Sequence, residues 1–228
     1  MKRIAATILL ALAGCCTDLL VTQEPEAFFT ARPLRTGQAE VGLRMMHAGW
    51  LPTERAVYGV GAALGIGQGW QMRAGWALAG THWRRGDSAQ LLLNAVELRG
   101  RRQLLEDGPF RLAVGTGCDL VLADPEEDGP VEYYGVRPMV QAAAGVYSDI
   151  GLGVFVPVAF SGTFLRPEQA TGWSVTPGAG VGFEHDHFFL RLAGNVPLGR
   201  FIEGDSLRLR AMQPSAGLEL GGRVQLFQ

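Results

Sequence analysis

Apolar and polar residues alternate through most of the chain from about residue 37 onward. The clearest stretch is GWQMRAGWAL, residues 69–78. One alternate row in it is apolar: Trp70, Met72, Ala74, Trp76 and Leu78. The other row is smaller and more polar, and it includes Gln71 and Arg73. A period of two residues is typical of an extended strand, because successive side chains point to opposite faces.

The same period predicts about ten strands, each of roughly 9 to 13 residues, between residue 37 and the C-terminus. A tilted membrane strand needs about 9 to 11 residues, whereas a strand of a soluble protein has about 5 to 6. The links between these strands alternate in length. Links at 67–68, 147–149 and 184–186 are short, and those at 123–132 and 161–170 are long and polar. This alternation is typical of an outer-membrane barrel with tight periplasmic turns and longer external loops.

Two segments leave the strand count open between eight and twelve. Around residues 89–98 the alternation is weak, since both rows mix polar and apolar residues. Near Pro214 the apolar row changes phase, from odd-numbered positions such as Leu207 to even-numbered ones such as Leu218. Either a bulge or a turn lies there.

Whether the apolar row faces lipid or the core of a soluble protein depends on the composition of the second, more polar row. It is rich in glycine, which accounts for 32 of the 228 residues. A glycine-rich face in water weakens strands with no packing gain, whereas the interior of a small barrel has little room for side chains. We therefore predict an all-β fold, namely an antiparallel up-and-down transmembrane β-barrel of about 8–12 strands, with ten as the best estimate of the strand count. Trp70 and Trp76 would then face lipid and Arg73 the interior.

The inward row also carries charges that must pair if they are buried. The predicted interior charged residues are Glu40, Arg44, Arg73, Arg111, Asp119, Arg137 and Arg191. They could fill the lumen by pairing with one another and with Glu97. Alternatively, rings of arginine could line a narrow channel that favours anions.

The N-terminus, MKRIAATILLALAGCC, has a basic start and a short apolar run from Ile4 to Ala13. This run is too short to span a bilayer, which takes about 20 residues, so it predicts a removable export signal. Leu12-Ala13-Gly14-Cys15 resembles the lipobox of bacterial lipoproteins. The resemblance implies cleavage before Cys15, a lipid on its thiol and, with no Asp at position 16, sorting to the outer membrane. An ordinary secretory signal is the alternative.

The resulting domain plan has three parts: a signal peptide (1–14), a lipidated N-terminus and tether (15–36) and a barrel (37–228).

Candidate chemistry outside the barrel interior is sparse. Residues 184–187 (EHDH) could hold a metal at a strand end, but a polar turn accounts for them, and four zinc ligands are not at hand. His82 with Asp87 and Ser88 could form a hydrolase site at the rim, yet no nucleophile motif accompanies them. We predict no catalytic residue, no metal and no cofactor.

Arginine pairs at predicted strand ends, Arg84-Arg85 and Arg99 to Arg102, suggest a solvated rim or contacts to lipopolysaccharide phosphates. The net charge of −2 and the lack of a basic patch with interleaved aromatic residues argue against nucleic-acid binding.

The region from about 37 to 227 resembles the small outer-membrane β-barrel proteins of Gram-negative bacteria, although Phe227 is followed by Gln228 rather than ending the chain. The resemblance implies an outer-membrane location with a periplasmic N-terminus. It also implies partners in outer-membrane lipid and, further, lipopolysaccharide or another envelope protein. The leading hypothesis is a lipid-anchored barrel with a structural or envelope-interaction role and a mostly filled interior. The alternatives are a porin-like anion-leaning channel, a rim enzyme acting on envelope lipid, and a soluble lipocalin-like periplasmic lipoprotein whose apolar row lines a ligand cavity.

Overall fold

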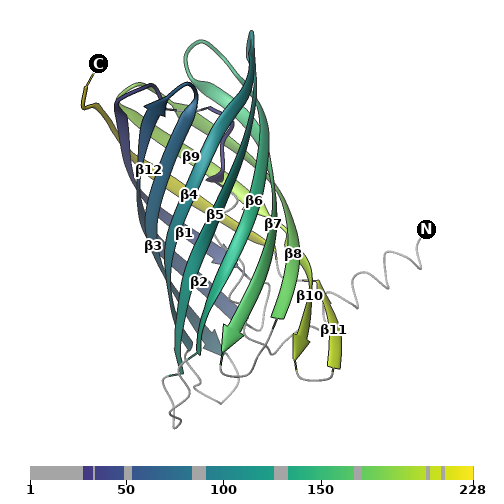
Figure 1. The fold of residues 1–228 in the computed structure, drawn as a ribbon. Coiled ribbons are helices and arrows are strands. Elements are labelled where there is room, and N and C mark those ends of the chain that lie inside the picture. The colour runs from purple at the N-terminus through teal and green to yellow at the C-terminus, as the bar shows by residue number, and fades with distance from the viewer. Residues whose placement is uncertain are drawn as a thin grey trace, which may run out of the picture.

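The computed structural model describes residues 28–32, 34–48, 53–83, 91–125, 133–166, 171–203, 206–211 and 214–227. These residues form a closed barrel of tilted antiparallel strands (Figure 1). The strands are β1 (Gln38–Ala48), β2 (Thr53–Gly67), β3 (Trp70–Trp83), β4 (Leu91–Asp107), β5 (Phe110–Pro125), β6 (Tyr133–Tyr147), β7 (Leu152–Arg166), β8 (Thr171–Glu184), β9 (Phe188–Asn195), β10 (Leu198–Glu203), β11 (Ser206–Ala211) and β12 (Ser215–Gln225). In this part of the chain no helix is long and apolar enough to cross a membrane.

The described barrel has ten strand positions around its circumference. Strands β1 to β9 pair in sequence order, β9 then pairs with β12, and β12 pairs with β1 to close the ring. Strand β8 pairs with β9 along one part of its length and with β10 along the rest. Gly178 on β8 is opposite Asn195 on β9, and Val175 on β8 is opposite Leu198 on β10. The break at 196–197 contains Pro197, which has no N–H to give to a ladder. The predicted all-β antiparallel barrel of eight to twelve strands, with ten as the best count, is confirmed.

Near Pro214, where the apolar row changes phase, one strand position of the barrel is divided between two strands, β11 and β12. Strand β11 pairs with β10 and β12 pairs with β9, both antiparallel, so β11 and β12 run in the same direction on either side of residues 212–214. The β10–β11 hairpin therefore prolongs the wall beside β8, at the end of the barrel opposite the C-terminus (Figure 1).

Strand β4 extends well beyond the weak strand predicted at 89–98, because it runs to Asp107. The prediction that Arg99, Arg101 and Arg102 lie at a strand end is wrong. A register shift between Gln103 and Leu105 interrupts the alternation, so Leu104 and Leu105 are both exposed. A bulge adds one residue to a strand and thereby hides the period of two on which the prediction depended.

Short turns join the strands at one end of the barrel, between β2 and β3, β4 and β5, β6 and β7, and β8 and β9. The turn between β2 and β3 has Gly67, Gln68 and Gly69 all at positive φ, a conformation that glycine adopts without steric cost. The first residue of β1, Gln38, is opposite Gln225 near the end of β12 at this same end. We call it the short-turn end.

The side chains segregate as the alternation predicts. Large apolar side chains lie on the outside, for example Leu43, which is 61% exposed, while charged side chains lie within, for example Arg137, which is 2% exposed. Trp70 and Trp76 are outside, and the Arg73 side chain points inward to Glu219.

Residues 28–32 and 34–36, which precede β1, are called the inner segment; residues 28–32 and 34 lie inside the barrel, while Arg35 and Thr36 are exposed. Phe28, Thr30, Ala31 and Leu34 are all buried. Ala31 N donates a hydrogen bond to Tyr147 Oη (3.2 Å), and Leu34 N donates one to Gln71 Oε1 (3.2 Å). No periodic pattern in the sequence marks this role.

Candidate functional site: the charged barrel interior

The largest group of ion pairs surrounds Arg191 on β9. Its guanidinium lies 3.0 Å from Glu40 on β1, 3.1 Å from Glu184 on β8 and 2.8 Å from Glu219 on β12. Arg223 on β12 pairs with Glu40 and Glu184, each at 2.8 Å, and Arg73 on β3 pairs with Glu219. These three arginines and three carboxylates form the first cluster, and all of their side chains except that of Arg73 are almost fully buried.

The register of the closing strands places these opposite charges together. Glu40 is directly opposite Arg223 across β1 and β12, and Glu219 is opposite Arg191 across β12 and β9. Cross-strand neighbours on one face are close enough to pair, so closure of the barrel assembles the cluster. The Phe189 ring packs beneath it, with its centroid 4.2 Å from Arg191 Cζ and 5.3 Å from Arg223 Cζ, in cation–π geometry.

The second cluster lies on β1, β4, β5 and β6. Arg44 Nη2 is 2.6 Å from Glu97 Oε1. Asp119 accepts hydrogen bonds from Arg99 Nη2 and Arg137 Nε, both at 3.1 Å. Register again brings the groups together, since Asp119 is opposite Glu97 on one side and Arg137 on the other. Within the described residues, these three arginines pair with Glu97 and Asp119.

Arg101 on β4 differs from the other interior arginines. Its guanidinium donates to Thr30 O (2.5 Å), to Arg32 O (2.9 Å) and to the Gln71 side chain, all of which are neutral. The described interior residues include seven arginines and five carboxylates. They are Arg44, Arg73, Arg99, Arg101, Arg137, Arg191 and Arg223, against Glu40, Glu97, Asp119, Glu184 and Glu219.

Glycines on the inward row make room for the long arginine side chains. A Cβ atom added to Gly59 would lie 2.5 Å from Arg44 Nε, and one added to Gly61 would lie 2.9 Å from Arg73 Nη2. The inner segment also passes close to glycine, because a Cβ on Gly115 would lie 2.9 Å from the Phe29 ring. The glycine-rich row is thus the surface against which the interior is packed.

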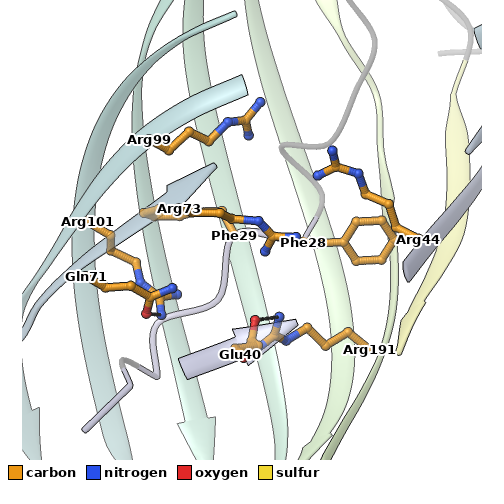
Figure 2. Close-up of a pocket in the computed structure, with 9 residues that line it drawn as sticks. All are labelled: Phe28, Phe29, Glu40, Arg44, Gln71, Arg73, Arg99, Arg101 and Arg191. Carbon is orange, nitrogen blue, oxygen red and sulfur yellow. Dashed lines mark hydrogen bonds and ion pairs between the residues drawn. The ribbon is translucent and has the colours of Figure 1, made fainter. Parts of the chain in front are cut away.

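Little space is left where the inner segment meets the arginines. Figure 2 shows Phe28 and Phe29 surrounded by side chains from the barrel wall. The cavity between them has a volume of about 30 Å³, enough for about two water molecules. It is lined by Phe28, Phe29, Glu40, Arg44, Gln71, Arg73, Arg99, Arg101 and Arg191. Toward the short-turn end the interior widens into an open vestibule of about 590 Å³, lined in part by Arg32, Arg35 and Arg111.

The predicted site residues take different positions in this interior. Glu40, Arg44, Asp119, Arg137 and Arg191 are buried within the two clusters, and Arg73 is somewhat more accessible. Arg111 lies instead at the vestibule, where it pairs with the exposed Glu106 at 2.7 Å. Cys15, the predicted lipidation site, lies outside the described residues, as do Arg84-Arg85 and Asp87-Ser88.

The two histidines of the 184–187 segment lie at an exposed turn. The His185 ring stacks near Phe183 and Phe188, and its centroid is 5.7 Å from that of His187. Within the described ranges, no three or more His, Cys, Asp or Glu side chains come together as metal ligands. Glu184 belongs to the first cluster and turns away from the histidines into the barrel.

Five buried charges of the clusters were missing from the predicted set: Arg99, Arg101, Glu184, Glu219 and Arg223. Strand phase could have identified three of them. Glu184 shares the parity of the inward Gly180 and Gly182, while Glu219 and Arg223 alternate with the outward Leu220 and Val224. Arg99 and Arg101 could not be placed, because polar and apolar residues mix on both rows at 89–98 and leave the facing of this strand open.

No protein family and no curated protein matches the chain. Solved structures with a similar fold include the outer membrane protease OmpT from Escherichia coli, with 9% identity and a TM-score of 0.40, covering 83% of this chain and 96% of that one. The translocator domain of the autotransporter NalP from Neisseria meningitidis has 12% identity and a TM-score of 0.48, covering 85% and 90%. Neisserial surface protein A has 10% identity and a TM-score of 0.37, covering 82% and 96%. The role of this chain is therefore inferred from its own surfaces.

Proposed function

We propose that this chain is an outer-membrane β-barrel with a structural or envelope-interaction role, whose lumen is closed in its resting state. The observation that carries the proposal is the filled interior: two ion-pair clusters and the inner segment leave a cavity of only about 30 Å³ between them. An open pore for solutes would need a continuous aqueous path, which these buried side chains interrupt.

The outer surface supports a location in lipid. Apolar side chains are exposed on strands all around the barrel, such as Leu43 on β1, Met72 on β3, Val140 on β6 and Leu192 on β9. Exposed apolar patches of soluble monomers seldom exceed a few hundred Å². A closed barrel leaves no unpaired edge in the hydrocarbon, which is the condition for strands to cross a bilayer. Lipid, rather than water, fits such an exterior.

Orientation and partners follow from the same proposal. The short-turn end, where the chain enters β1, would face the periplasm, and a lipid on Cys15 would hold the chain to the inner leaflet of the outer membrane. Membrane lipid is then the first partner, and lipopolysaccharide or another envelope protein at the long-loop end is the second.

The first experiment is the gel mobility of detergent-extracted protein from a separated outer-membrane fraction, unboiled against boiled. A closed barrel resists SDS until it is heated, so we expect a heat-dependent shift in that fraction. Extraction by salt alone with no shift would contradict the membrane location. It would favour the soluble lipocalin-like barrel.

The second experiment separates a closed barrel from a channel. We expect the purified protein to be electrically silent in planar bilayers. The number of arginines among the described interior residues favours one rival, a narrow channel that prefers anions. That rival predicts steady conductance that falls when Arg73 or Arg137 is replaced by Ala. Such conductance would overturn the closed state while leaving the membrane barrel intact.

A further inference from the structure

The outer face of the barrel has a hollow near the long-loop end, which is the end opposite the short turns. It crosses strands β3 to β8, which lie side by side in the wall (Figure 1). Its volume is about 850 Å³, within the range of about 300–1,000 Å³ of pockets that bind small organic molecules. We call this hollow the outer groove, and its apolar lining includes Trp76, Val96, Leu120, Val136 and Phe164.

Strand register explains the shape of the groove. Those five exposed side chains form one cross-strand row, in which each residue is directly opposite the next. Adjacent strands are about 4.8 Å apart, so the row extends over about 19 Å of the wall. The two aromatic rings stand at its ends, and the shorter aliphatic side chains form the floor between them.

The groove becomes polar toward the long-loop end. The next outward row in that direction contributes Asn94, Leu122, Tyr134 and Arg166 to the lining. Arg166 is the last residue of β7, it is exposed, and it lies directly opposite Tyr134 on β6. The groove is therefore apolar toward the middle of the wall, and it carries a positive charge and a phenol at its rim.

We propose that the outer groove binds one molecule of lipopolysaccharide, with acyl chains of its lipid A part over the apolar row and a phosphate at Arg166. This inference rests on the proposed outer-membrane location with the short-turn end toward the periplasm, which puts the groove in the outer leaflet. An apolar hollow that faces a bilayer is filled by lipid chains, and lipopolysaccharide supplies both chains and phosphates in that leaflet. Arginine binds phosphate oxygens through two parallel charge-assisted hydrogen bonds, and the Tyr134 hydroxyl can donate one more.

The test is native mass spectrometry of the full chain, released from detergent micelles after mixing with lipid A. We expect one lipid A molecule to stay bound to each chain. Lipid A from which the phosphates have been removed keeps the same acyl chains. It should bind about tenfold more weakly, because the charge-assisted hydrogen bonds are lost.

The variant Arg166→Gln tests the phosphate contact. It should bind lipid A about tenfold more weakly and should no longer distinguish the phosphorylated from the dephosphorylated form. Arg102→Gln is the matched control. Arg102 is also exposed on the outer face, but it lies near the short-turn end, with its guanidinium carbon 5.4 Å from the centroid of the Trp70 ring. This variant should bind lipid A as the unmodified protein does.

The variant Val136→Trp tests the apolar floor by filling it with a larger side chain. Its binding of lipid A should fall about tenfold, the effect of displacing about two methylene groups from the groove. Val140→Trp is the matched control, because Val140 is exposed on the same face of β6 but lies nearer the short-turn end and does not line the groove. It should bind lipid A normally.

The variants are compared as barrels that keep the heat-dependent gel shift. If Val136→Trp does not fold, Arg166→Gln still tests the site, since Arg166 is exposed. Absence of the shift in the unmodified protein would contradict the membrane barrel itself. A normal shift with no bound lipid A, or with equal binding by Arg166→Gln and Arg102→Gln, would overturn the groove proposal alone. A dimer of the chain in place of the lipid complex would also overturn it, because it would assign the groove to a second copy.

Discussion

Glu219 shows how much a single interior residue can control. Its carboxylate is fully buried and lies between Arg73 and Arg191, so it is a partner of two guanidinium groups on different strands. A buried ion pair stabilises little relative to apolar packing, yet removing one partner leaves an uncompensated charge. Each carboxylate of the interior is therefore required once the arginines are present.

The variant Glu219→Gln is expected to destabilise the barrel by about 3–5 kcal/mol, because it leaves an uncompensated buried charge. Unfolding by urea in lipid vesicles measures this loss. Glu106→Gln is the matched control, since Glu106 pairs with Arg111 at the vestibule and its side chain is 60% exposed. An exposed pair contributes about 0–1 kcal/mol. Equal losses for the two variants would contradict the assigned burial of Glu219.

At the scale of the element, the inner segment is held by a few specific hydrogen bonds. Gln71 on β3 accepts one from Leu34 N and another from the Arg101 guanidinium, which itself donates to the carbonyls of Thr30 and Arg32. Gln71 thus links the segment to the wall directly and through Arg101. Phe28 and Phe29, which chymotrypsin recognises, are kept inside by these contacts.

The variant Gln71→Ala is expected to increase chymotrypsin cleavage after Phe28 and Phe29 about tenfold. The reason is that a lost hydrogen bond to a buried group costs roughly 1–1.5 kcal/mol, and slow proteolysis follows the population of the open form. Cleavage rates are measured on folded protein that retains its heat-dependent gel shift. Gln103→Ala is the control, because the Gln103 side chain bonds only to Leu105 and Glu106 near the β4–β5 turn among the described contacts. No difference between the two variants would show that Gln71 does not hold the segment.

For the whole molecule, the decisive property is an apolar exterior around a charged interior, the reverse of a soluble protein. Leu43 lies in the middle of β1 on the outer face, and Ile150, which is 69% exposed, lies in the turn between β6 and β7. The two positions are both exposed and apolar, but they differ in their distance from the ends of the barrel. They allow the surroundings of the exterior to be tested directly.

The variant Leu43→Arg is expected to destabilise the barrel by about 2–4 kcal/mol in lipid vesicles, whereas Ile150→Arg should cost about 0–1 kcal/mol. The reason is that a charge is most costly near the centre of the hydrocarbon and little affected at its edge. Urea unfolding in vesicles measures both. If Leu43→Arg were neutral and made the protein more soluble without detergent, the exterior would face water and the proposed membrane location would be wrong.

The fold was predictable because strand side chains alternate with a strict period. Trp70, Trp76 and Arg73 could be assigned to faces from one stretch of ten residues, and Glu40, Arg44 and Arg191 could be placed inside by the same rule. The end of β4 could not be predicted, since its bulge breaks the period between Gln103 and Leu105. The inner segment could not be predicted either, because an irregular chain in a lumen has no periodic signal.

The sequence alone determined the strands, their facing and the approximate barrel size, because all three follow from local alternation and link length. Only the tertiary structure decided which charges meet. Arg223 is 183 residues from Glu40, and the two pair because β12 closes on β1. The tertiary structure also decided that Arg101 donates to neutral groups, since the inner segment folds back against it. Pairing across a closed ring depends on register between distant strands, and no local pattern encodes that register.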